Sequence, residues 1–158
     1  MSLASATARM FASVRETFTT GVGSVSAPTI THNVLGAQVA LTPVSEISTF
    51  ILAMEAGVGT IDLTALIGTN GKAIDATGLK VQWLHIRATT GNANPVTIAE
   101  GASNGYALAG AAWKVVLNAD QQFSFIGNDT TPDVGPTDKI IDITGTTTQS
   151  IVVEIILG

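Results

Sequence analysis

The feature that most constrains this chain is a succession of short segments rich in β-branched and aromatic residues, separated by clusters of Gly, Asn, Asp and Pro. Such segments are typical of β-strands, and Gly and Asn tolerate the positive φ that tight turns need. Long helical windows are missing between them, so the sequence predicts an all-β, antiparallel sandwich over residues 45–158. The eight predicted strands are residues 46–54, 60–66, 79–88, 95–100, 113–117, 122–127, 139–144 and 149–157.

The first 44 residues have a different composition, which predicts an extended N-terminal arm (residues 1–44). No Asp, Glu, Lys or Arg occurs from residue 17 to residue 45, and Gly and Pro interrupt a stretch rich in Thr, Val and Ala. Within this arm, residues 2–18 have the spacing of a short amphipathic helix, with Leu3, Ala6, Met10 and Val14 near one side. A flexible terminal tail is the alternative interpretation.

Length and charge exclude several functions. A chain of 158 residues fits one domain, and with 46% hydrophobic and 12% charged residues it is expected to fold. The net charge of -5 and seven scattered Lys and Arg residues argue against direct nucleic-acid binding. The start lacks the pattern of a secretory signal, and the most apolar run, residues 50–54, is too short to span a membrane. So little charge also predicts that much of the surface is either covered by Thr, Ser, Asn, Gln and Ala or buried against other subunits.

The last predicted strand indicates where a partner binds. Ile151, Val153, Ile155 and Leu157 alternate on one face, while Val152 and Ile156 flank Glu154 on the other face. An outer face of a sandwich sheet normally meets water, so the second apolar set predicts a subunit interface or burial beneath the arm. An incidental apolar outer face is the alternative.

A search for catalytic groups gives no candidate. The two histidines, His32 and His85, stand in no nucleophile or metal motif, and His85 alternates with Trp83 and Arg87 on one strand face. The glycine pairs at residues 21–23 and 57–59 lack the features of a phosphate-binding loop. We therefore predict a protein that is not an enzyme, has no catalytic or cofactor-binding residues and needs no cofactor.

Three aspartates and three aromatic residues raise two further possibilities, a metal site and a sugar site. The chain has no Cys, which excludes disulfides and thiolate metal sites. Asp129, Asp133 and Asp138 are the densest carboxylates and raise the possibility of a calcium site, although their spacing misses the EF-hand pattern and a stiff surface loop is the favoured interpretation. Trp83, Tyr106 and Trp113 raise the possibility of a sugar-stacking platform, with core packing as the favoured role of the tryptophans.

Several segments together resemble a family, the capsid decoration or cement proteins of tailed bacteriophages. They are the uncharged arm, the Ile-Asp-Leu-Thr-Ala-Leu segment (residues 61–66), the Asn-Gly turns, the Ala- and Gly-rich crossing from Tyr106 to Trp113 and the apolar last strand. The resemblance covers most of the chain from about residue 60 onward.

This resemblance implies a jelly-roll-like sandwich that oligomerises as a dimer or trimer. The protein would be made in the host cytoplasm and bind the capsid exterior, where it would bridge subunits of the major capsid protein without a role for membranes. The residues expected at the interfaces are Leu3, Met10, Phe11, Val14, Phe18, Ile30, Leu35, Val152 and Ile156.

Two other functions remain open at this point. One is a tail, fibre or head–tail component of the same kind of virion. The other is a carbohydrate-binding, lectin-like module, which would use the same sandwich and expose Trp83, Tyr106 or Trp113. Exposure of those rings on the surface would favour the carbohydrate-binding module over the virion components.

Overall fold

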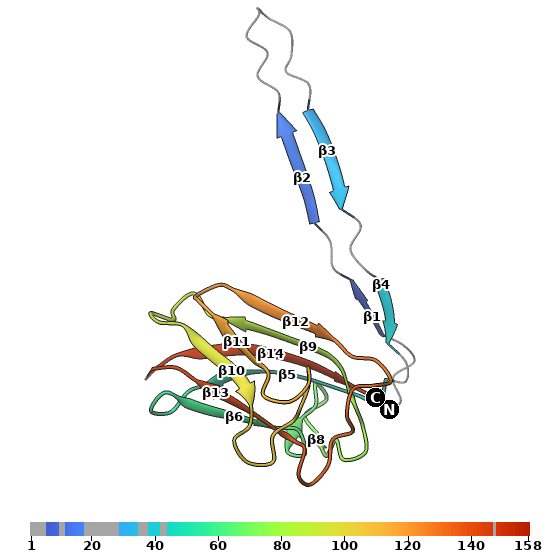
Figure 1. Ribbon diagram of the computed structural model, residues 1–158, viewed down its shortest axis with the longest axis vertical. Coiled ribbons are helices and arrows are strands. Elements are labelled where there is room, and N and C mark those ends of the chain that lie inside the picture. The colour runs from blue at the N-terminus through green and yellow to red at the C-terminus, as the bar shows by residue number, and fades with distance from the viewer. Residues whose placement is uncertain (1–5, 10–11, 18–28, 35–37, 42–43, 147) are drawn as a thin grey trace, which may run out of the picture. The chain divides into compact units, whose positions relative to one another are not determined.

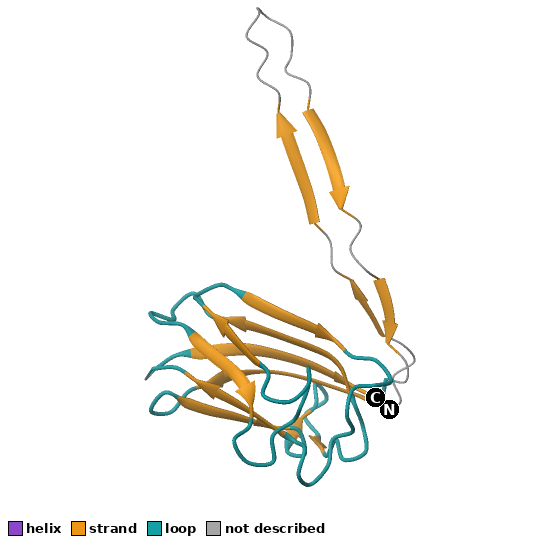
Figure 2. Ribbon diagram, in the orientation of Figure 1, coloured by secondary structure: helices purple, strands orange, loops and turns teal. Residues whose placement is uncertain are grey.

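The computed structural model describes residues 6–9, 12–17, 29–34, 38–41, 44–146 and 148–158 (Figure 1). The chain divides into two compact units, one of residues 7–40 and a larger one that contains residues 41–158. Every regular element among the described residues is a β-strand, and none of these residues is helical (Figure 2). The predicted all-β class is therefore confirmed.

The smaller unit contains strands in both halves of residues 7–40. The four strands among its described residues, whose ends extend to Ala6 and Leu41, are β1 (Ala6–Arg9), β2 (Ala12–Thr17), β3 (Thr29–Val34) and β4 (Gln38–Leu41). Strand β1 is paired with β4, and β2 is antiparallel to β3, with Ala12 opposite Val34 and Thr17 opposite Thr29. The helix predicted within residues 2–18 is therefore wrong for the described part of that range. Helix propensity is a weak preference, and the β-branched strand β3 provides a pairing partner that overrides it.

The described residues of the larger unit form ten strands, of which the eight longer ones correspond to the eight predicted strands. They are β5 (Glu46–Ala53), β6 (Val58–Asp62), β7 (Leu66–Ile67), β8 (Ala73–Ile74), β9 (Val81–Ala88), β10 (Val96–Glu100), β11 (Lys114–Leu117), β12 (Gln122–Ile126), β13 (Ile140–Thr144) and β14 (Ser150–Leu157). The two-residue strands β7 and β8 pair with each other and were not predicted.

The eight longer strands form two four-stranded antiparallel sheets. One has the order β12-β9-β14-β5 and the other the order β11-β10-β13-β6. Buried side chains of both sheets, such as Leu84 and Ile155 from the first and Ile98 and Ile143 from the second, belong to one hydrophobic cluster. This arrangement is consistent with a β-sandwich, as the turn spacing predicted.

The strand predicted over residues 60–66 begins and ends earlier than expected. Strand β6 spans Val58–Asp62, and the chain turns after Asp62 because the Asp62 carboxylate accepts hydrogen bonds from the Thr64 backbone N–H at 2.9 Å and the Thr64 hydroxyl at 2.7 Å. An aspartate that bonds the backbone two residues ahead forms an Asx turn, which competes with strand pairing. The β-branched composition of the segment predicted a continuous strand and gave no indication of this turn.

Two buried amides join the loops at one end of the larger unit. The Asn92 side chain donates from Nδ2 to the Ser150 carbonyl at 2.9 Å and accepts the Ser150 N–H on Oδ1 at 2.9 Å, as a strand neighbour would. Asn92 Oδ1 also accepts a hydrogen bond from the Thr89 hydroxyl. Gln149, next in the chain to Ser150, donates to the Asn94 carbonyl. The loop after β9 is thereby fixed to the start of β14.

We expect Asn92→Asp to destabilise the protein by about 2 kcal/mol, because the substitution removes the donor to Ser150 and sets a carboxylate against a buried carbonyl oxygen. Urea unfolding at pH 7 measures the change. The matched control is Asn70→Asp, since Asn70 is exposed and uses only its accepting oxygen, toward the Lys72 N–H. Equal stability of the two variants would contradict the role given to Asn92.

Candidate functional site

The candidate site is the outer face of the β12-β9-β14-β5 sheet, which we call the β14 face. Strand register places its outward side chains in three rows across the four strands. The first row is Ile47, Ile156, Trp83 and Ile126, the second is Thr49, Glu154, His85 and Ser124, and the third is Ile51, Val152, Arg87 and Gln122.

The first row of the β14 face is entirely apolar. Its four side chains come from four different strands and are only partly buried, whereas the inward residues Ile155 and Leu84 beside them are fully buried. Trp83 is the largest member, and Ile51 in the third row is 69% exposed. An outward apolar row of this kind is unusual for a sheet that faces only water and is typical of a protein contact surface.

The middle row contains a carboxylate and an imidazole from neighbouring strands. His85 Nδ1 lies 3.1 Å from Glu154 Oε2, and His85 Nε2 lies 3.2 Å from Gln122 Oε1. The Trp83 ring lies beside the His85 ring, with centroids 6.4 Å apart. Each ring nitrogen thus lies within hydrogen-bonding distance of a side chain from a neighbouring strand, which holds His85 between β14 and β12.

Glu154, His85 and Ser124 lie in one row, in the order of a carboxylate, an imidazole and a hydroxyl. A nucleophilic triad requires the imidazole to bond the hydroxyl, but His85 Nε2 contacts Gln122 instead of Ser124. The row is therefore best described as a hydrogen-bonded part of an exposed surface. His85 shares its face with Trp83 and Arg87, as the alternation of these residues predicted.

The outer face of the other sheet, which we call the β13 face, has a different character. One row across its four strands is Val116, Thr97, Thr144 and Val58, and the next is Lys114, Ala99, Asp142 and Thr60. Thr side chains and charges interrupt the apolar ones, so no continuous apolar row crosses this sheet. The two outer faces of the larger unit are therefore chemically distinct.

Among the predicted interface residues, Val152 and Ile156 lie on the β14 face, flanking Glu154 as predicted, and both are partly buried. Val14 lies in β2 and Ile30 in β3, where only the backbone is described. Leu3, Met10, Phe11, Phe18 and Leu35 lie outside the described residues.

The sequence did not single out Trp83, Ile126 and Ile47 as partners of Ile156. The alternation within each strand gave the outward direction of these side chains. The register between strands, which aligns them in one row, becomes visible only in the folded sheet.

Two of the three rings suggested for sugar stacking are buried. Tyr106 is 0% exposed and Trp113 is 8% exposed, and Trp113 stacks on Phe123 with its centroid 6.5 Å away. Trp113 Nε1 donates to the Tyr106 carbonyl at 2.8 Å. These two residues therefore pack the core, and Trp83 is the one member of the set that lies on an outer face.

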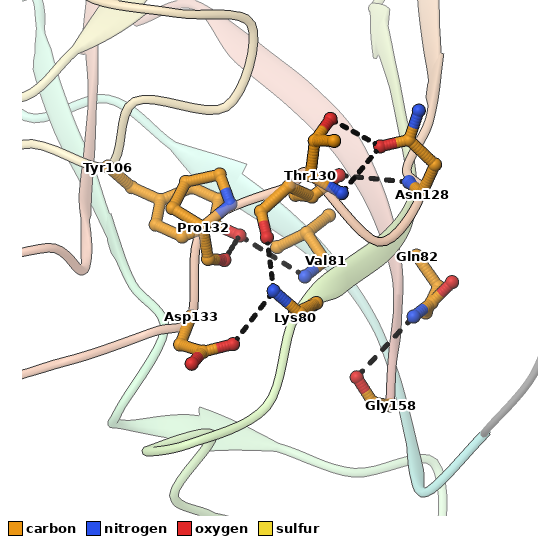
Figure 3. A network of polar contacts seen from close by, with 10 residues as sticks. Lys80, Val81, Gln82, Tyr106, Asn128, Thr130, Pro132, Asp133 and Gly158 are labelled. Atoms are coloured by element: carbon orange, nitrogen blue, oxygen red, sulfur yellow. Dashed lines mark hydrogen bonds and ion pairs between the residues drawn. The ribbon is translucent and has the colours of Figure 1, made fainter.

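Tyr106 also joins three separate segments through its hydroxyl group (Figure 3). The hydroxyl donates to the Pro132 carbonyl at 2.7 Å and accepts the Val81 N–H at 3.2 Å. Burial raises the pKa of Tyr106 to about 12, and the nearby charge of Asp133 acts in the same direction, whereas the Val81 hydrogen bond opposes it. The crossing segment, the loop before β13 and the start of β9 therefore meet at one buried hydroxyl.

The carboxylates of the acidic loop take part in local contacts and do not converge. Asp133 pairs with Lys80 at 3.0 Å, and the Lys80 ammonium also donates to the Thr131 carbonyl (Figure 3). Asp138 accepts a hydrogen bond from the neighbouring Thr137 hydroxyl. In the described part of the chain, no group of three His, Cys, Asp or Glu side chains converges as metal ligands would. The loop is held by local polar contacts and the ion pair with Lys80.

A shallow cleft of about 350 Å³ opens between the edges of β5 and β6, next to β7, and includes Phe50, Thr60 and Asp62 in its walls. The Asp62 carboxylate contacts the Lys139 ammonium at 2.9 Å. Burial alone raises the pKa of Asp62, but hydrogen bonds from Thr64 and Lys139 outweigh it, and the pKa is lowered. Asp62 is thus an ionised, paired structural group, which is poorly suited to proton transfer near neutral pH.

No family model matches the chain, and no curated protein or solved structure matches it. A helix of the length and hydropathy needed to cross a bilayer does not occur among the described residues.

Proposed function

We propose that this protein is a structural virion component that binds the outer surface of a tailed-phage capsid and stabilises it by bridging major capsid protein subunits. The observation that carries the proposal is the strand order of the larger unit. The first and last of its eight long strands, β5 and β14, are neighbours, and consecutive long strands alternate between the two sheets except for the β10–β11 pair. This order supports a jelly-roll-like sandwich, an architecture used by viral capsid and lectin domains.

Two further observations support a binding role. The β14 face offers an apolar row with a polar row beside it, while the β13 face is richer in Thr and charge. A surface of this kind supports contacts with another protein, and repetition of weak contacts over a symmetric shell adds up to strong attachment. Residues 1–44 serve in this proposal as an extended arm that reaches a neighbouring subunit.

The proposal is tested by adding the purified full chain to capsids assembled from the cognate major capsid protein. We expect saturable co-sedimentation and a higher temperature of capsid disruption. A chain that starts at residue 45 keeps strands β5 to β14 and is expected to bind about tenfold more weakly or worse, because the arm contacts are lost. The control is Val116→Lys in the full chain, which adds charge to the β13 face while keeping the arm. Failure of the full chain to co-sediment at any concentration would contradict the proposal.

A carbohydrate-binding module is the second candidate, and only the placement of Trp83 favours it. Trp83 lies outward on the β14 face beside the His85 ring, and an outward ring next to hydrogen-bonding side chains is a feature of sugar-binding surfaces. Glycan-array binding that disappears in Trp83→Ala would support this function over the capsid role. Trp113→Ala is unsuitable for this test, because Trp113 packs in the core.

A further inference from the structure

We infer that the β14 face is the contact surface of a two-fold symmetric homodimer. The inference assigns the β14 face to self-association, so that the proposed attachment to a capsid then rests on the strand order and on residues 1–44. The inference is tested on the purified chain alone, separately from capsid binding. Two copies of the face fit each other row by row when their sheets are stacked with the strands aligned, the commonest way in which sheets pack. The fit follows from the register of the four strands.

The symmetry operation is a rotation by 180° about an axis that runs parallel to the strands, midway between β14 and β9. It sets β14 of one copy against β9 of the other, and β5 against β12, while every residue keeps its row. An interface of this kind is isologous, so each contact occurs twice.

The apolar row is complementary to itself under this operation. Ile156 of one copy faces Trp83 of the other, and Ile47 faces Ile126. Four aliphatic or aromatic contacts are thereby formed along one row. A tryptophan in the middle of such a row has the position and residue type of an interface hot spot.

The middle row is also complementary to itself under this operation. Glu154 of one copy faces His85 of the other, and both copies contribute the same contact. In the third row Val152 faces Arg87, whose long aliphatic stem covers an apolar neighbour while its charge reaches solvent.

The other in-plane two-fold axis, perpendicular to the strands, is unfavourable. An axis of this kind through the middle row would set Glu154 against Glu154 across the interface, so that two carboxylates face each other. Like-charge juxtaposition in an interface costs several kcal/mol. Charge therefore selects the axis parallel to the strands.

The size of the face sets the expected affinity. Four strands about 4.8 Å apart and three rows about 7 Å apart give a footprint of roughly 400 Å² per copy, at the low end for specific association. We therefore expect a dissociation constant in the micromolar range.

The first experiment measures the mass of the full chain by sedimentation equilibrium at concentrations up to about 100 µM. The wild-type protein is expected to form a species of twice the 16.1 kDa chain mass. Ile156→Lys is expected to weaken the dimer at least about 100-fold, because it places a charge in the apolar row of both copies. Val116→Lys, on the exposed β13 face, is the matched control and is expected to leave the dimer unchanged.

The second experiment tests the register with reversed charges. His85→Glu is expected to remain monomeric, since it sets two carboxylates against each other twice. Glu154→Lys is expected to remain monomeric because it replaces the carboxylate that each His85 faces in the other copy with an ammonium group. An equimolar mixture of the two variants is expected to dimerise, because both cross-interface pairs then become attractive. Mixing cannot restore the His85–Glu154 contact within a chain, so recovery reports on contacts between chains alone. Circular dichroism of each variant verifies that it is folded.

Three outcomes would overturn the inference. One is a wild-type protein that stays monomeric at about 100 µM. Another is a dimer that Ile156→Lys leaves intact, which would assign self-association to another surface, such as the unit of residues 7–40. The last is a mixture of the charge-reversed variants that stays monomeric while the wild type dimerises.

Discussion

Gly127→Ala is expected to destabilise the protein by about 3 kcal/mol, at the upper end of the usual cost of overpacking. A Cβ atom on Gly127 would lie 2.1 Å from the Val81 carbonyl oxygen and 3.2 Å from the Gln82 Cα, both backbone atoms with little freedom to move. The Gly127 N–H also donates to the Gln82 carbonyl at 2.8 Å. The chain after β12 therefore fits closely against the start of β9, where an irregularity in the β14–β9 register lies.

Chemical denaturation of Gly127→Ala beside Gly135→Ala measures this effect. A Cβ on Gly135 meets no atom within 4 Å, and replacing Gly where space and backbone allow it stabilises a protein by up to about 1 kcal/mol through the unfolded state. Gly135→Ala is thus expected to be neutral or slightly stabilising. Similar denaturation midpoints for the two variants would show that the chain after β12 can move away from the start of β9 at little cost in free energy.

Tyr106→Phe is expected to cost about 2–4 kcal/mol, although it removes only one oxygen atom. The Val81 N–H and the Pro132 carbonyl would lose a shared partner, and an unsatisfied buried group costs about 1–3 kcal/mol. Urea unfolding at pH 7 measures the loss. An unchanged stability would mean that water replaces the hydroxyl at this position.

The same hydroxyl is expected to make stability depend on alkaline pH. Its pKa of about 12 in the folded state lies above the value of 10.0 for an unperturbed tyrosine, so between these values the unfolded chain ionises first. This pKa difference contributes about 2–3 kcal/mol to the free energy of unfolding. The contribution is complete below pH 10 and is lost as the pH rises toward 12. The free energy of unfolding of Tyr106→Phe should not show this fall between pH 10 and pH 12. An equal dependence on pH in both proteins would contradict the raised pKa of Tyr106.

Much of the fold was predictable because its strands carry local signals. β14 shows this best, since the alternation of Ile151, Val153 and Ile155 gave both its extent and its buried face. Where a side chain took part in local bonding the prediction failed, as at Asp62, which ends β6 by capping a turn. The pairing of β7 with β8 was missed because two residues are too few to show a period.

The candidate site was predictable only in part. Val152 and Ile156 were evident from the pattern of one strand, whereas the apolar row also needs Trp83, Ile126 and Ile47, which are distant in sequence. Strand order and register decide which of these residues become neighbours, and a single sequence carries no direct signal of either. The calcium and sugar hypotheses rested on composition, and they weakened once Asp133 was seen paired with Lys80 and Trp113 was seen in the core.

The position of β14 between β9 and β5 has a consequence for how the protein folds. The ladder between β5 and β14 joins residues as distant in sequence as Glu46 and Leu157, and β9 is also paired with β14 across a long stretch of chain. Loop-closure entropy makes such contacts slow to form, so folding on the scale of milliseconds to seconds is expected. Until β14 docks, the facing edges of β5 and β9 lack their partner. During that interval newly made chains are most exposed to pairing with one another.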